Sequence, residues 1–234
     1  MIIKPLGSSS EGNAYLISDG ATTIMLECGL PINDLKIKTD FFNPRPAACL
    51  ISHSHLDHAK AVENLLAMGI DCYLSKYTMA ELKIKSPFAH EMQEGYKLTI
   101  GSFEIQPMEL KHDVYCLGFY IYSKQSRETL FFATDTYYIP YRFKNLDYIM
   151  VEANYAAEIV NSNIINGDFT LAAKERLVRS HLEIESTILW LKQQDLRRCK
   201  RIYLLHLSDG NSNKEDFKNR VIEAVGVPTT ICEK

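Results

Sequence analysis

One short segment constrains this chain more than any other, because it brings together three histidines and an aspartate: His53, His55, Asp57 and His58. The segment directly follows the apolar residues 47–51, a run typical of a buried strand that would hold the next loop stiff. Neutral imidazole and carboxylate groups suit Zn, Mn or Fe, and His-x-His in an extended segment directs two rings to the same side. A single buried histidine usually only satisfies a neighbour, but four such residues together predict a metal site.

Further polar residues stand where other apolar strands are predicted to end. These are His112 after residues 105–110, Asp135 after residues 130–134 and His206 after residues 202–205. Two ions need more ligands than the first cluster supplies, and the Asp57-His58 step would point toward a second ion. Taken singly, His112 and His206 would more often be structural. The remaining histidine, His90, lies in a polar stretch that is typical of a surface helix.

The composition is that of a soluble globular protein. Hydrophobic residues make up 46% of the 234 residues and charged residues 24%, without a membrane-spanning apolar stretch. No linker or repeat divides the chain, so we expect one domain over residues 1–234, and the lack of a secretory signal predicts a cytoplasmic protein. The six cysteines form no Cys-x-x-Cys pair and are expected to be reduced. A net charge of −3 argues against a protein that coats nucleic acid by bulk charge.

The order of predicted strands and helices favours two sheets between helices. Asp19-Gly20 separates two β-prone runs, residues 15–18 and 23–27, which is a hairpin signal. Further strands are predicted at residues 47–51, 70–74, 97–100, 103–110, 117–122, 129–133, 148–152 and 201–205. Helices are predicted at residues 60–68, 77–85, 170–179 and 182–194 and around 215–225. Two mixed groups of this kind predict two packed sheets with helices outside them.

With these residues in place, the chain resembles the metallo-β-lactamase fold, an α/β fold whose αββα sandwich places two mixed β-sheets between helices. The match runs from Gly7 to about residue 213. The resemblance implies two divalent metal ions, Zn or Mn, and every ligand position is filled. One ion would be held by His53, His55 and His112, the other by Asp57, His58 and His206, with Asp135 bridging them.

Smaller motifs resemble the YycJ-like (WalJ-like) branch of bacterial and phage proteins, which are described as DNA 5′-exonucleases. They are residues 7–13 (GSSSEGN), 27–29 (ECG), 152–155 (EANY), 180–182 (SHL) and 206–211 (HLSDGN). Glu27 departs from the Asp that is usual in this branch, and Glu183 from the usual Ser. The resemblance implies DNA or another nucleotide phosphodiester as the partner, and a homodimer is compatible with it.

The same motifs contain the candidate substrate-binding residues, which are Ser9, Asn13, Asn154 and Asn211. The small residues around Ser9 and Asn13 would let backbone N–H groups approach a phosphate, although they could equally form a tight turn under the metal site. Asn211 could instead fix the loop after His206 or cap the following helix.

His181 is surplus to the metal ligands. Ser180-x-x-Glu183 matches a capping box, which would place His181 in the first turn of a helix, a natural seat for a phosphate. A protonated imidazole there would donate a proton to the leaving oxygen. We therefore predict that His181 is catalytic, together with the aspartate of the first motif, Asp57. The alternative is a histidine that merely begins a helix.

Three insertions known from relatives of this fold are missing from the sequence. The segment between Asp135 and His181 is too short for a β-CASP domain, and that between His112 and Asp135 too short for a tRNA-gripping arm. The segment after His206 is too short for the helical domain of glyoxalase II-type thioesterases. These absences favour a compact nuclease or a small phosphodiesterase.

The leading hypothesis is a metal-dependent phosphodiesterase, a DNA 5′-exonuclease in which metal-bound hydroxide attacks phosphorus and His181 assists the leaving group. The alternatives are a cyclic-nucleotide phosphodiesterase, a thioester or lactone hydrolase, and a metal-bearing binding module. Two weaker features bear on nucleic acid. They are the basic residues 197–201, which could be a solvated face, and the tyrosines Tyr137, Tyr138, Tyr141 and Tyr155, which are more often core or rim than base-stacking.

Overall fold

The N-terminal part of the chain builds a six-stranded sheet in the computed structural model, which describes residues 1–233. In spatial order its strands are β1 (Ile2–Gly7), β2 (Ala14–Ser18), β3 (Thr23–Leu26), β4 (Cys49–Leu50), β5 (Cys72–Leu74) and β6 (Ala89–Glu91). The first three are antiparallel, and β3 to β6 run parallel. Parallel neighbours need crossover connections, which contain α1 (Ile32–Lys38), α2 (Leu56–Ala59), α3 (Val62–Ala67) and α4 (Lys76–Glu81).

The rest of the chain builds a seven-stranded sheet. Along the chain its strands are β7 (Leu98–Ile100), β8 (Phe103–Leu110), β9 (Cys116–Ser123), β10 (Thr129–Ala133), β11 (Tyr148–Glu152), β12 (Arg201–Leu205) and β13 (Thr229–Ile231), and they are neighbours in this order. β7 to β10 are antiparallel, whereas β10 to β13 are parallel. Both sheets are therefore mixed, as expected.

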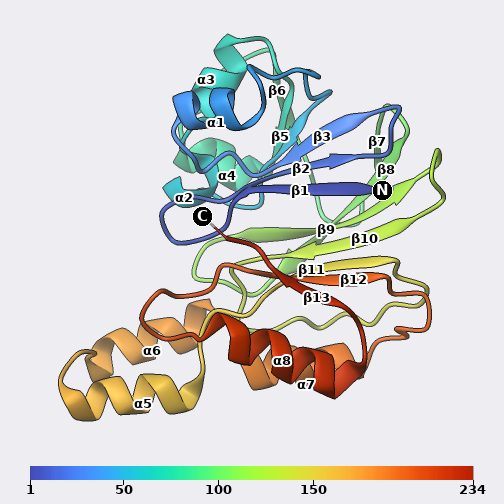
Figure 1. The fold of residues 1–234 in the computed structure, drawn as a ribbon. Coiled ribbons are helices and arrows are strands. Elements are labelled where there is room, and N and C mark those ends of the chain that lie inside the picture. Colours follow the sequence, from blue (N-terminus) through green and yellow to red (C-terminus); the bar gives the residue numbers. More distant parts are fainter. Residues whose placement is uncertain (234) are drawn as a thin grey trace.

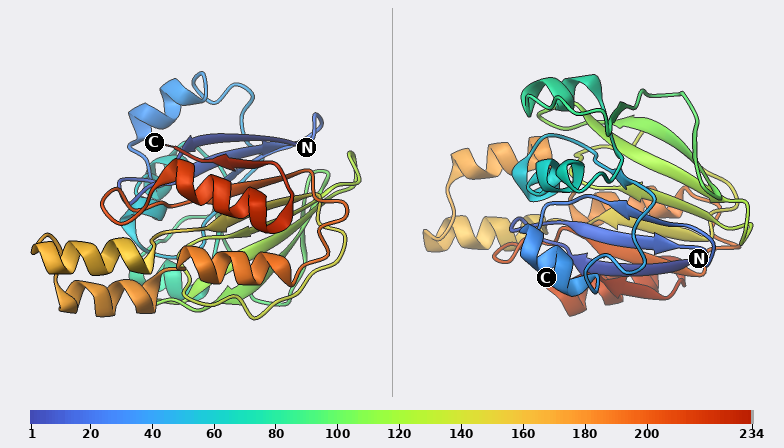
Figure 2. Two further views of the ribbon diagram at one scale, coloured as in Figure 1. Left: turned by 60° about the horizontal axis from the view of Figure 1, so that its bottom comes forward. Right: turned by 90° about the horizontal axis from the view of Figure 1, so that it is seen from above.

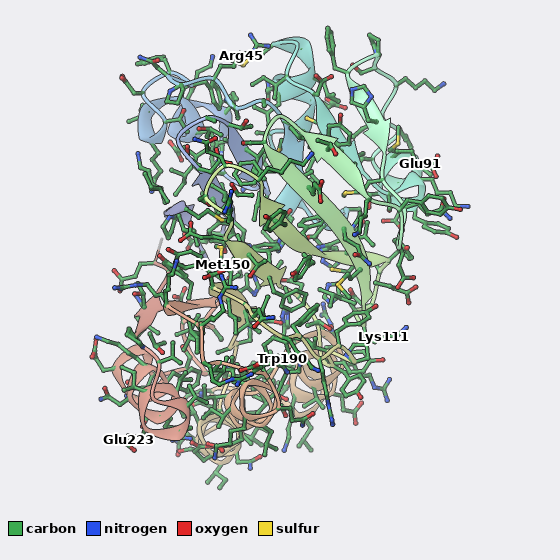
Figure 3. All side chains as sticks on the ribbon, turned by 90° about the vertical axis from the view of Figure 1, so that its right-hand side faces the viewer. Arg45, Glu91, Lys111, Met150, Trp190 and Glu223 are labelled. Carbon is green, nitrogen blue, oxygen red and sulfur yellow. The ribbon has the colours of Figure 1, made fainter. Side chains whose placement is uncertain are left out.

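The two sheets lie face to face, and helices cover their outer faces (Figure 1). α1, α3 and α4 lie over the first sheet, and α7 (Ile184–Lys192) and α8 (Lys214–Val225) over the second. Fully buried apolar residues fill the space between the sheets, where Tyr15 meets Phe132 with ring centroids 5.6 Å apart. Figure 3 shows Met150 in this central layer and Trp190 between the second sheet and its helices. The predicted αββα sandwich is confirmed.

One helical hairpin projects beyond the sandwich (Figures 1 and 2). It consists of α5 (Ala157–Asn166) and α6 (Leu171–Ser180), and we call residues 157–180 the α5–α6 arm. Val160 is the buried residue of α5, and α6 has none. The arm is therefore fixed at its root rather than along its length.

Most predicted elements agree with the structure. The sequence analysis missed the short elements β1, α1, β6 and β13 and the ten-residue helix α5. Pro5 weakened the strand signal of β1, but β1 pairs only with β2 at the edge of its sheet, where proline is tolerated. The expected surface helix at His90 is wrong, because His90 lies in β6 and its Nε2 is 2.6 Å from Asp71. Among residues 1–233, no helix has the length and apolar character needed to cross a membrane.

Candidate metal centre

Strand ends from both sheets meet at one edge of the sandwich and carry the predicted ligands. β4 leads into His53, while β8, β10 and β12 lead into His112, Asp135 and His206. Asp135 and His206 have φ angles of 49° and 53°, a left-handed conformation that is costly for residues other than glycine. Strain of this kind is concentrated at functional sites, where the surrounding structure over-determines the backbone.

The rest of the first motif begins α2. His55 is the N-cap residue with an extended backbone (φ −60°, ψ 143°), and Asp57 and His58 lie in the first turn. The change from extended to helical backbone within the motif separates its side chains into two sets. This local geometry explains why one short segment supplies ligands to two neighbouring positions.

Three groups of candidate ligand atoms result, each with its members within 4.8 Å of one another. The first comprises His53, His55, His112 and Asp135, and the second comprises Asp57, His58, Asp135 and His206. Asp135 belongs to both of these groups, as the expected bridging role requires. The third comprises Asp135, Glu152, His181 and His206. All seven predicted metal ligands are thus brought together by the fold.

The chemistry of these residues fits a bound divalent metal. The Nε2 atom of His53 is buried and has no hydrogen-bond partner among residues 1–233, although the Asp135 carboxylate lies 3.8 Å away. The Nδ1 atom of the same ring lies 2.8 Å from the Ser52 hydroxyl, which fixes the orientation of the ring. A buried ring nitrogen without a partner is costly, and a metal ion would satisfy it.

The protonation states of the buried groups also fit a bound divalent metal. Burial lowers the pKa of His53 well below its ordinary value, which keeps this imidazole neutral and able to bind a metal. Burial alone would raise the pKa of Asp135, but the His206 and His58 imidazoles outweigh it and hold the pKa well below its usual range. Burial would lower the pKa of His206, but carboxylates led by Asp135 raise it to about 10. Metal binding would replace the protons that offset these carboxylates.

Buried polar side chains behind the ligands hold them in place. The Glu27 carboxylate accepts the Ser52 N–H at 3.2 Å and lies 3.6 Å from Nδ1 of His58. The Asn13 side-chain amide donates to the carbonyl of Ser9 at 3.0 Å and lies 3.1 Å from Nε2 of His58. Such supporting contacts orient metal ligands and tune their basicity. In the sequence Glu27 stood out only as a departure from the usual Asp. In the structure it supports the candidate ligand His58.

His181 faces the same centre and is paired with a buried carboxylate. Its Nδ1 lies 2.6 Å from Oε1 of Glu152, whose Oε2 accepts the N–H groups of Thr136 and Leu182 at 2.9 Å and 3.3 Å. Burial would lower the pKa of His181, but the Glu152 carboxylate outweighs it and raises the pKa above its ordinary value. The ring also stacks on His206, with centroids 5.2 Å apart.

The predicted capping box is wrong. Ser180 is the last residue of α6, and His181 is its C-cap residue with an extended backbone. The N-cap of α7 is Glu183, whose carboxylate accepts the N–H of Ser186 at 3.1 Å. His181 is therefore positioned by its link between two helices and by Glu152, and not by a helix N-terminus.

The four candidate substrate-binding residues lie beside the ligands, where they contact protein groups. Ser9 is buried, and its neighbour Ser10 lines the cavity. Asn13 contacts His58, as described, and the Asn154 amide donates to the carbonyl of His206 at 2.8 Å. The Asn211 side chain accepts a hydrogen bond from Asn163 of the α5–α6 arm at 3.0 Å. Their contact with substrate stays a prediction.

An open cavity of about 340 Å³ lies over the centre. Its lining residues are Ser10, His55, Asp57, His112, Asp113, Asp135, Phe169, Ala173, Arg176, Leu177, Ser180, His181 and His206. Sequence reasoning missed Asp113, whose carboxylate lies 2.9 Å from Nε2 of His112, although its place next to a predicted ligand was a usable signal. It also missed Phe169, which lies in the loop before α6, and Arg176, for which the only signal was the helical pattern of α6.

Comparison with known proteins agrees with this geometry. The family model described as "Beta-lactamase superfamily domain" matches residues 36–207. No curated protein matches the chain in sequence.

Solved structures with the same fold match the chain along nearly its whole length. The metallo-beta-lactamase fold protein YhfI from Bacillus subtilis has a TM-score of 0.72 at 16% identity, with 99% of this chain and 96% of that one covered. A diphosphatase from the PhnP family has a TM-score of 0.70 at 12% identity, with 97% and 94% covered. The short form of human tRNase Z has a TM-score of 0.68 at 18% identity, with 100% and 97% covered. These likenesses establish the fold.

Proposed function

Because this chain belongs to the beta-lactamase superfamily, we propose that it is a dinuclear metal-dependent phosphodiesterase that shortens DNA from the 5′ end. The observation that carries this proposal is His181, which lines the cavity beside the first two ligand groups and is paired with the buried Glu152. Neither of the two expected ions needs His181 as a ligand, so this histidine is available for proton transfer. Breaking a phosphodiester bond calls for such a group at the leaving oxygen.

Each part of the site has a chemical task in this proposal. Two divalent ions held by the seven ligands would supply hydroxide at neutral pH and offset charge on the phosphoryl oxygens. Asp57 and Asp135 hold their positions through the short contacts to His206 and His58. Glu152 accepts the Nδ1 proton of His181, which leaves Nε2 of the ring to donate a proton to the leaving oxygen.

The names of two relatives in fold support a phosphate bond as the target. One is a diphosphatase and the other a tRNase, and both act on bonds to phosphorus. The choice of DNA and of its 5′ end rests on the smaller motifs of the YycJ-like branch, among them residues 7–13 and 206–211.

A second candidate is a cyclic-nucleotide phosphodiesterase. The size of the cavity favours it, because about 340 Å³ is enough for one nucleotide and lies in the range of small-molecule pockets. The chemistry at phosphorus would be the same, so only the substrate distinguishes the two candidates.

The test is a comparison of substrates with protein loaded with Mn or Zn. DNA and RNA labelled at the 5′ end, a cyclic nucleotide and a thioester would be incubated in parallel. We expect release of labelled mononucleotides from DNA. Turnover of the cyclic nucleotide alone would select the second candidate, and turnover of the thioester alone, with intact metal content, would exclude both.

The role of His181 is tested by His181→Ala. We expect kcat to fall by about 100- to 10,000-fold, the usual contribution of a general acid, while metal content measured by mass spectrometry stays at the wild-type level. His90→Ala is the matched control. His90 lies in β6, where it pairs with Asp71, and it is not among the lining residues of the cavity. Loss of metal from His181→Ala would show that His181 is a ligand instead.

A further inference from the structure

One wall of the cavity is formed by the α5–α6 arm rather than by the sandwich. The lining residues from α6 are Ala173, Arg176, Leu177 and Ser180. Their spacing of three, four and seven residues from Ala173 places them on one face of the helix. A face of this kind normally packs on a core, but no residue of α6 is buried. The face is therefore open to whatever occupies the cavity.

Arg176 is the only lysine or arginine among the lining residues that the structure describes. Its guanidinium forms no hydrogen bond or ion pair with the residues that the structure describes, 1–233. Three carboxylates, those of Asp57, Asp113 and Asp135, line the same cavity. An arginine left unpaired at a cavity that contains carboxylates is available to an anion brought in from outside, since its planar fork matches phosphate geometry.

The cavity wall that contains Arg176 also contains apolar side chains. Phe169 lies in the loop before α6, and with Leu177 it gives the cavity that Arg176 also lines an apolar part of its wall. An aromatic ring beside an arginine suits a nucleotide, because the ring can stack on a base while the arginine pairs with phosphate.

The root of the arm ties this wall to the metal centre. The Asn163 side-chain amide donates to the carbonyl of Gly210 at 2.8 Å and to Asn211 at 3.0 Å, in the loop that follows His206. Glu158 pairs with Arg220 of α8 at 2.6 Å. The arm is thus anchored to the segment that carries a metal ligand, and its inner face keeps its place over the site.

We propose that Arg176 and Phe169 form a subsite for the nucleotide next to the scissile bond, in which Arg176 binds a second phosphate and Phe169 packs against a base. The inference rests on the proposed phosphodiesterase function and narrows its substrate class to molecules with at least two phosphates. A cyclic mononucleotide, which has one phosphate, does not use the arginine in this way.

The test uses a thymidine dinucleotide with and without a 5′-phosphate. For the Mn-loaded wild-type protein we expect a KM at least about tenfold lower with the 5′-phosphate, in line with a charge-assisted contact. Arg176→Ala should reduce this ratio to about one, and Arg176→Lys, which keeps the charge without the fork, should retain part of it. Phe169→Ala should raise both KM values by about tenfold and keep their ratio.

Arg179→Ala is the matched control, because Arg179 lies on the outer face of the same helix and does not line the cavity. It should behave as wild type. The proposal is overturned if Arg179→Ala loses the KM ratio between the two dinucleotides as fully as Arg176→Ala does. It is also overturned if this KM ratio is unchanged in Arg176→Ala, or if it is one in the wild-type protein.

Direct binding separates this proposal from the proposed function. The Kd values of the same two dinucleotides would be measured by calorimetry with the metal-loaded proteins. If the wild-type protein cleaves neither dinucleotide but its preference for the 5′-phosphate depends on Arg176, the subsite stands and the phosphodiesterase function fails. If cleavage occurs without any effect of Arg176 on Kd, the function stands and the subsite fails.

Discussion

Buried carboxylates behind the histidines determine what those histidines can do. Glu152 is fully buried and contacts His181 at 2.6 Å and His206 at 3.4 Å. Burying a carboxylate costs free energy unless the carboxylate is paired, so Glu152 requires partners of this kind. The same carboxylate therefore contacts both a candidate catalytic residue and a candidate metal ligand.

At the residue scale, Asp19 predicts a pH dependence of stability. Partial burial raises its pKa, but hydrogen bonds led by those from Ser102 and Ser123, both at 2.6 Å, outweigh this effect and lower the pKa below its ordinary value. A lowered carboxyl pKa stabilises the fold above the unfolded-state pKa, and this stability is lost as pH falls through the folded-state pKa.

We therefore expect Asp19→Asn to lower the free energy of unfolding at pH 7 by about 1 kcal/mol, a value discounted for solvent screening, and by less at pH 3. Urea unfolding at both pH values measures the difference. Asp34→Asn is a suitable control, because Asp34 is exposed and lies in the first turn of α1. An equal loss at both pH values would contradict the electrostatic explanation.

At the scale of elements, the loops after β1 and β3 pack directly on α2. The Cys28 N–H donates to the carbonyl of His58 at 2.8 Å, and the Asn13 N–H donates to the carbonyl of Asp57 at 2.7 Å. A methyl group on Gly29 would overlap the backbone of Asp57. Glycine is therefore required here by close approach of two backbones, and this contact sets the position of the second ligand group.

Gly29→Ala is expected to displace the start of α2. The free energy of unfolding should fall by about 1–3 kcal/mol, as in overpacked cores, and metal content should fall from two ions toward one. Gly210→Ala is the control, because nothing lies within 4 Å of a Cβ added there. Elemental analysis with thermal unfolding makes both measurements, and a normal metal content in Gly29→Ala would contradict the expected displacement.

The error at residues 180–183 is also informative at this scale. Ser-x-x-Glu is a local pattern, and it does not exclude Ser180 as the last residue of the helix that is predicted at residues 170–179. Here α6 extends through Ser180, and the next helix takes Glu183 as its cap. The carboxylate that holds His181 comes from β11, distant in the sequence, which no local pattern contains.

At the scale of the whole molecule, the candidate ligands join the two halves of the sandwich. His53, His55, Asp57 and His58 follow the first sheet, whereas His112, Asp135 and His206 follow strands of the second. Metal binding therefore links the sheets and should stabilise the entire fold, because an ion that binds only the folded state contributes by mass action.

Removal of metal with a chelator is accordingly expected to lower Tm, and Mn or Zn added back at about 100 times Kd should restore about 2.7 kcal/mol of stability. Differential scanning fluorimetry measures this without any substrate. His90→Ala, outside the centre, should respond as wild type does. A Tm that is independent of metal, with metal bound, would mean that the ions do not join the two sheets.

By itself the sequence predicted two sheets and most strand positions, and its resemblance to the metallo-β-lactamase fold predicted the set of candidate ligands. The reason is that His53 to His58 lie within one segment and that apolar strands carry their signal in a few adjacent residues. Only the tertiary structure decided how the strand ends that carry the candidate ligands meet and that Glu152 supports His181. It also decided that the α5–α6 arm forms one wall of the cavity, with Arg176 and Phe169. These contacts join residues far apart in the chain, and each depends on the packing of the two sheets and on the way buried polar groups are satisfied.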